Sequence, residues 1–263
     1  MNKAWKPYAI LGGVVFAVFL LVEIPAALVY NTTKSLWANP AKPVKIFNIE
    51  GSLWGGQAGP VETPNQIIQN FVWNLHPWAL LIGRFEADIS LNNNQSRAKA
   101  VVGKTFTGQI YFAQAEARVP ANELLTALKL PAFPVSGEFR ANLKKLALSN
   151  QTIARAEGTL TWFGAGVQFP QRLNFGDISA RFETTDEGIK AVVADGGGVL
   201  ELNGQLAIKT NGQYQFNGVM AARDGVDSPL ANSLKFLGQP TPEGKVAVVY
   251  SGKMQDLGLV AAN

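Results

Sequence analysis

The chain has 263 residues and a formal net charge of +4, and only 16% of its residues are charged, against roughly 25% in an average globular protein. Cysteine is absent and histidine occurs once, as His76, which excludes disulfides, thiol catalysis and metal sites built from thiolates or several histidines. Basic residues are spread along the chain, so no face for nucleic acid is expected. This composition disfavours an enzyme, and we predict no catalytic residue, metal or cofactor.

Residues 8–30 form an apolar segment that carries one charge, Glu23. Crossing a bilayer takes about 20 apolar residues, so the segment predicts a single transmembrane helix. A cleaved signal peptide is the alternative, but its apolar region is about 7–15 residues long, and Pro25-Ala26-Ala27 is a poor cleavage site. Glu23 either marks a partner or pathway inside the membrane or extends its side chain to the interface, and both interpretations stay open.

The charges around this segment predict its orientation. Lys3 and Lys6 precede it and only Lys34 follows closely, so the positive-inside rule places the N-terminus in the cytoplasm. An exported, cysteine-free domain on one membrane helix is typical of a bacterial inner-membrane protein whose main domain is periplasmic. We therefore expect a cytoplasmic tail at 1–7, the helix at 8–30 and a linker at 31–45.

Beyond the linker the sequence predicts short β-strands. Apolar residues recur with period two in 139–148, 200–209 and 246–250, which is typical of half-buried strands in an antiparallel sheet. Glycines that fit turns or bulges open many of these runs. They are Gly108, Gly137, Gly158, Gly204 and Gly244.

Two short segments are predicted to be helical. Asn122 is placed to cap a helix over 123–130 that Pro131 ends, and Ser228 is placed to cap a helix with Pro229 in its first position. The second helix presents one apolar face to the sheet, made of Leu230, Leu234 and Leu237.

Spacing along the chain predicts a tandem duplication. Gly51 opens a Gly-Ser-Leu-Trp stretch and Gly158, 107 positions later, opens Gly-Thr-Leu-Thr-Trp. The two predicted helices and the turns after them repeat at a similar distance. The predicted fold is thus mainly β, a curved antiparallel sheet or sandwich-like domain of two similar halves, at 46–150 and 151–263, with two short helices.

Two motifs that suggest chemistry are better explained by structure. Gly196–Gly198 precedes a strand, whereas a phosphate loop precedes a helix, so we expect a hairpin. Glu86 and Asp88 share one strand face and could serve an acid–base reaction, for instance a hydrolase using His76, but a solvated face is the simpler interpretation.

Tryptophans give the strongest remaining signal. Their large rings either complete an apolar core or face a groove or partner, and a core role is favoured. The candidates for partner- or groove-facing positions are Trp54, Trp73, Trp78 and Trp162.

Taken in order, several stretches resemble the type II secretion system protein N family. They are Ile24-Pro25-Ala26 after the apolar segment, Glu50–Gly56 (EGSLWGG), Val72–Leu81 (VWNLHPWALL), Ala156–Trp162 (AEGTLTW) and Ala194–Gly204 (ADGGGVLELNG).

This resemblance implies a non-catalytic accessory part of the machine that moves folded proteins across the outer membrane. Its implied partners are the assembly-platform proteins C, L and M, the secretin and membrane lipid. The family also looks like the AsmA and lipopolysaccharide-bridge proteins, whose curved sheets hold acyl chains, so a lipid- or hydrophobe-binding groove is the alternative function.

Overall fold

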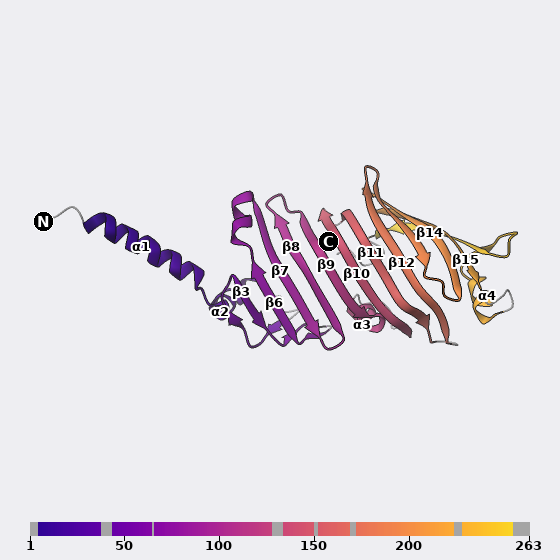
Figure 1. Ribbon diagram of the computed structural model, residues 1–263, viewed down its shortest axis with the longest axis horizontal. Helices are drawn as coiled ribbons and strands as arrows, with labels where there is room; N and C mark the ends of the chain where they lie inside the picture. Colours follow the sequence, from indigo (N-terminus) through magenta and orange to yellow (C-terminus); the bar gives the residue numbers. More distant parts are fainter. Residues whose placement is uncertain are drawn as a thin grey trace. The chain divides into compact units, whose positions relative to one another are not determined.

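The computed structural model describes most of the chain, as two compact units. The described residues are 5–37, 44–64, 66–127, 134–149, 152–168, 172–223 and 228–254. Unit 1 comprises Met1–Asn93 and unit 2 comprises Asn94–Asn263. Antiparallel strands, coloured along the chain in Figure 1, form the sheets of both units and most of unit 2, which confirms the predicted mainly β class.

Unit 1 begins with two helices, where the sequence predicts one. Helix α1 (Trp5–Val22) and helix α2 (Ala26–Trp37) are separated by Glu23–Pro25, because Pro25 lacks an N–H and its ring cannot continue a helix. Residues 31–37, expected in a linker, extend α2. Among the described residues, no helix has both the length and the apolar character that crossing a membrane requires.

The strands of unit 1 form two sheets. A small sheet has the order β1–β4–β5, and a larger one has the order β2–β3–β6–β7, all antiparallel. The bounds are β1 Lys45–Ile46, β2 Glu50–Gly51, β3 Gly55–Ala58, β4 Val61–Glu62, β5 Ile67–Ile68, β6 Asn70–Leu75 and β7 Arg84–Asn93. The 3₁₀-helix η1 (Pro77–Ile82) joins β6 to β7.

Unit 2 is an antiparallel sheet with two short helices. Its strand order follows the chain from β8 to β15, and then β17 and β16 complete the sheet. The strands are β8 Ser96–Thr105, β9 Ile110–Pro120, β10 Val135–Ser149, β11 Thr152–Val167, β12 Leu173–Thr185, β13 Gly188–Asp195, β14 Leu200–Lys209, β15 Gln213–Ala222, β16 Gln239–Pro240 and β17 Val246–Lys253. Three of them contain the predicted period-two runs. The boundary between the units, at Asn93 and Asn94, differs from that of the proposed halves, and the duplication stays a prediction.

The two helices of unit 2 match the prediction in part. Helix α4 (Pro229–Leu234) begins as expected, since the Ser228 hydroxyl accepts the Ala231 N–H at 3.1 Å, but it ends at Leu234 and leaves Leu237 half exposed. Helix α3 (Ala121–Ala127) follows β9 directly, so Asn122 lies inside it rather than at its cap. Its predicted end, at Leu130 and Pro131, lies outside the described residues.

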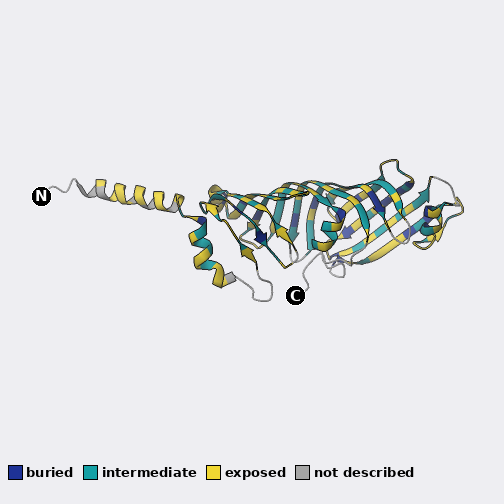
Figure 2. Cartoon of the chain, turned by 90° about the horizontal axis from the view of Figure 1, so that it is seen from below, coloured by how far each residue is buried: buried dark blue, intermediate teal, exposed yellow. Residues whose placement is uncertain are grey.

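The core of unit 2 lies under α4. Leu230 and Leu234 of α4 pack on a buried cluster from β14 and β17, to which Val248 belongs. Ile189 belongs to a second, smaller cluster, and it and Val248 are the largest fully buried side chains among the described residues. Figure 2 shows how few positions are buried, so the strands depend heavily on their mutual pairing.

Several glycines serve this pairing by making room for an aromatic ring on the neighbouring strand. Gly56 pairs with Trp73, Gly103 with Tyr111 and Gly252 with Tyr214, and in each pair a β-carbon on the glycine would press into the ring. The same is true of Gly204 in β14, which makes room for the ring of Phe216 in β15, and Gly218, its partner in the ladder, makes room for the same ring on its own strand. Gly204, predicted to open its run, therefore lies inside β14, just as Gly137 and Gly158 lie inside β10 and β11.

Substituting alanine at Gly56 and, separately, at Gly55 tests this role. The added methyl at Gly56 would clash with the Trp73 ring and the Glu50 carbonyl, whereas at Gly55 the nearest atom lies 3.5 Å away. We expect Gly56→Ala to lower the free energy of unfolding by about 1–3 kcal/mol and Gly55→Ala to change it little. Thermal unfolding of the full chain in detergent measures both, and equal effects would contradict the proposed role.

Candidate functional site

The segment after α1 is joined to the sheet of unit 1 through the Gly51–Gly56 turn. The Leu53 N–H donates to the Ile24 carbonyl at 2.8 Å, and the Leu53 carbonyl accepts the Trp73 indole N–H at 3.1 Å. Pro25 and Ser52 form an isolated bridge beside these bonds. Gly51 permits the turn because its φ is +89°, a conformation that other residues rarely adopt.

Helix α2 covers an apolar cleft above this junction. The cleft has a volume of about 220 Å³, and Trp73 lies in it with Phe71, whose ring centroid is 5.7 Å away. Its remaining lining consists of Ala26, Val29, Tyr30, Thr33, Ile46, Ile49, Leu53 and Ala58. The cleft can accept an apolar side chain, and among the described residues that line it only Tyr30 carries an ionisable group.

The turn between β6 and β7 carries a cluster of exposed large apolar side chains, separate from those of α1. Helix η1 begins at Pro77 and ends at Ile82, and the φ of +75° at the next residue, Gly83, lets the Gly83 N–H return to the carbonyls of Ala79 and Leu80. Ala79 is buried and anchors the turn, while its neighbours project outward. The exposed residues are Trp78, Leu80, Leu81, Ile82 and Phe85.

The only histidine closes the base of this turn. His76 Nδ1 lies 2.9 Å from Glu86 Oε1, and His76 Nε2 lies 2.9 Å from Asp88 Oδ2. The hydrogen bond to Glu86, followed by that to Asp88, raises the pKa of His76 above its usual value of 6.5. Because ionised carboxylates only accept hydrogen bonds, both ring nitrogens donate and the imidazolium form is favoured.

The three side chains of this cluster form a clamp. Glu86 and Asp88 do share one face, as predicted, but each binds a ring nitrogen of His76, which leaves the imidazole no free lone pair to act as a base. No described set of three or more His, Asp or Glu side chains is arranged to hold a metal ion. The cluster instead ties the residue before η1 to the strand after it.

In unit 2, Trp162 is part of the sheet. It pairs across strands with Phe139, at 5.2 Å between ring centroids, and its indole N–H donates to the Ser136 carbonyl at 3.0 Å. Trp54 instead lies in the turn between β2 and β3, so the two tryptophans that looked equivalent in sequence occupy different settings.

The glycine run is a hairpin connection, as predicted, and one ion pair holds it. Asp195 accepts hydrogen bonds from the N–H groups of Gly197 and Leu202, and Arg223 Nη1 lies 2.8 Å from its carboxylate. Arg223 also donates to the carbonyls of Gly198 and Leu200. The guanidinium, helped by the two N–H groups, lowers the pKa of Asp195 to about 2.

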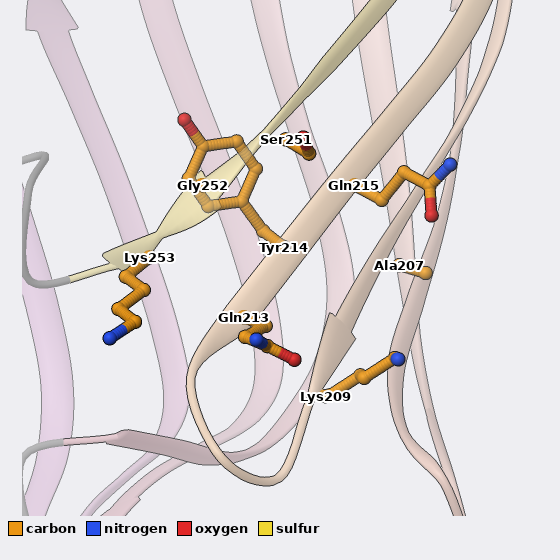
Figure 3. Close-up of a pocket in the computed structure, with 8 residues that line it drawn as sticks. All are labelled: Ala207, Lys209, Gln213, Tyr214, Gln215, Ser251, Gly252 and Lys253. Atoms are coloured by element: carbon orange, nitrogen blue, oxygen red, sulfur yellow. The ribbon is translucent and has the colours of Figure 1, made fainter.

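An open polar groove lies at the β14–β15 hairpin. Its volume is about 580 Å³, and Figure 3 shows Lys209 and Gln213 near the turn and the Tyr214 ring beside Gly252 of β17. Its lining also includes Gln215, Ser251 and Lys253, and none of its described lining residues is a carboxylate. Such a surface suits a polar or anionic partner group.

The candidate site residues predicted from the sequence lie in different settings in the structure. Trp73 lines the cleft, Trp78 is exposed, Trp54 and Trp162 are partly buried, and Glu23 is exposed between α1 and α2. That any of them binds a partner stays a prediction. Sequence reasoning missed the Asp195–Arg223 pair, because its members lie 28 positions apart and only the hairpin register joins them.

These features define a mainly β protein with an apolar N-terminal helix. Its most distinctive side-chain clusters, at Leu53, His76 and Asp195, connect structural elements to one another. The chain belongs to the family described as "Type II secretion system (T2SS), protein N", whose profile matches residues 42–249. This match confirms the family resemblance read from the sequence.

Two relatives extend the match over nearly the whole chain. It is 28% identical over 244 residues to the type II secretion system protein N of Aeromonas hydrophila, covering 90% of this chain and 93% of that protein. It is 25% identical over 247 residues to the protein of the same name from Vibrio cholerae serotype O1, covering 92% and 97%. No solved structure matches significantly.

The clamp makes stability depend on pH near neutrality. Because its pKa is raised in the folded protein, His76 stabilises the fold fully below about pH 6.5, and this contribution is lost as the pH rises through the raised value. We expect thermal unfolding temperatures between pH 6 and 9 to fall more steeply for the wild type than for His76→Gln. Parallel profiles would contradict the clamp.

The ion pair between Asp195 and Arg223 gives a second prediction about stability. Asp195→Asn removes the charged partner of Arg223, and we expect a loss of about 1–3 kcal/mol at pH 7 by chemical unfolding. Because its folded pKa is lowered, the wild-type contribution is lost as the pH falls from about 4 toward about 2. Asp186→Asn, in the exposed turn between β12 and β13, is the control and is expected to have little effect.

Proposed function

We propose that the chain is an accessory component of the type II secretion machinery, held in the inner membrane by α1 and presenting its strands to the periplasm as an interaction surface. The observation that carries the proposal is the family match over residues 42–249 together with relatives that align over more than nine-tenths of their length.

The anchor is supported by the character of α1. Tyr8, Leu11 and Phe16 are among its many exposed apolar side chains, which water would not favour. Lys3 before this helix and Lys6 in its first turn favour a cytoplasmic N-terminus. Glu23 then lies at the outer end of the helix, near the interface.

The interaction surface is supported by an incompletely covered strand. Strand β17 pairs with β15 over Gln213–Met220, but β16 covers its other edge only at Val246 and Ala247 among the described residues. Val249 and Tyr250, farther along this edge, are exposed. Such an edge can receive a strand from a partner, with main-chain hydrogen bonds providing affinity.

The proposed partners are the assembly-platform proteins C, L and M and the secretin. The alternative, a groove that holds acyl chains, is not favoured, because the aligned relatives carry the name of a secretion component. We also propose a non-catalytic role, since the one histidine is held by two carboxylates.

Deleting the gene tests the function. We expect proteins that the machine normally exports to accumulate in the periplasm, and expression of the full chain to restore their export. Unchanged export in the deletion strain would contradict the proposal.

Site-specific photocrosslinking tests the surface. A crosslinker at Val249 should capture an assembly-platform protein in cells that contain the whole machine, and a crosslinker at exposed Lys190 on β13 should not. The product should vanish in cells that lack the platform proteins. Persistence of the same product there would assign the edge to another partner.

A further inference from the structure

The β6–β7 turn exposes an apolar tip that the proposed function does not use. Trp78 and Leu81 are each 78% exposed and Ile82 is 69% exposed, with Phe85 beside them at 53%. Side chains of this size rarely stay exposed together unless something covers them.

The tip is held in shape before anything covers it. Two pairs at the base of the turn fix the strands, Leu75 with Ala87 and Asn74 with Asp88. The His76 N–H also donates to the Glu86 carbonyl at 2.8 Å, in addition to the side-chain clamp. A preorganised tip loses little conformational freedom when it is buried.

The chemistry of the tip favours lipid over a protein partner. Between Pro77 and Phe85 the only charged residue is Arg84, which is exposed and adjacent to Phe85. An apolar cluster with one tryptophan and one flanking arginine matches a bilayer interface, where tryptophan favours the headgroup level and arginine binds phosphate. The nearby carboxylates, Glu86 and Asp88, are turned to His76, which reduces their repulsion of anionic headgroups.

We propose that this tip inserts into the interface of a phospholipid bilayer, with Leu81, Ile82 and Phe85 among the acyl chains and Arg84 at the phosphates. The proposal rests on the anchor in α1, which keeps unit 1 beside the bilayer. Tethering of this kind makes even weak insertion effective, because the local concentration of the tip at the surface is high. The turn is then a second membrane contact of the protein.

The absence of cysteine allows a direct test on the full chain. Leu81→Cys, Phe16→Cys and Phe106→Cys are each labelled with an environment-sensitive fluorophore and reconstituted into vesicles of phosphatidylethanolamine and phosphatidylglycerol that contain acyl-chain doxyl quenchers. Phe106, 76% exposed near the β8–β9 turn, is the matched control for an exposed aromatic position. We expect quenching at position 81 to be at least twofold greater than at position 106.

The label at position 16 separates the two proposals. Strong quenching at 16 but not at 81 would overturn the insertion of the turn and leave the anchor standing, whereas no quenching at 16 would count against the anchor itself. Equal quenching at 81 and 106 would also overturn the inference, because it would indicate general adsorption. Protection of the label at 81 from iodide only when secretion proteins are present would assign the tip to a protein partner instead.

Discussion

The contact between a glycine on one strand and an aromatic ring on the next shapes both units. Gly56 lies under Trp73 in unit 1, and Gly204 of β14 lies under Phe216 of β15 in unit 2. A ring that lies flat on a neighbouring glycine covers backbone that a thin sheet would otherwise leave open to water. Since few side chains are fully buried, these contacts and the hydrogen-bonded ladders carry much of the stability that a thicker core would supply.

Because many of these contacts join different strands, only the features that depend on neighbouring residues in the chain could be predicted from the sequence. Period-two runs predicted β10, β14 and β17, and Ser228 predicted the start of α4, because these signals depend on neighbouring residues. The role of Gly204 was not predictable, since the ring that requires it lies on another strand. The break after α1 was within reach, because Pro25 lies in it and proline cannot continue a helix, but the length of the apolar segment favoured a single helix.

The candidate sites follow the same division. The shared face of Glu86 and Asp88 could be predicted from their spacing, but their contact with His76 depends on a turn that brings residues ten and twelve positions apart together. The motifs that carry the family resemblance prove to be joints: EGSLWGG connects the segment after α1 to the sheet, and ADGGGVLELNG forms a pinned hairpin. In both motifs the described contacts are structural.

The junction at Leu53 has a mechanical consequence. Tension on α1 would reach the Ile24 carbonyl and pass through Leu53 to the Trp73 indole in β6, an inner strand of its sheet. The load would then be shared by the hydrogen bonds of the strands on both sides of β6 instead of peeling the short outer strand β2 away. The segment after α1 is thereby linked to an inner strand of the sheet and not to its short outer strand β2.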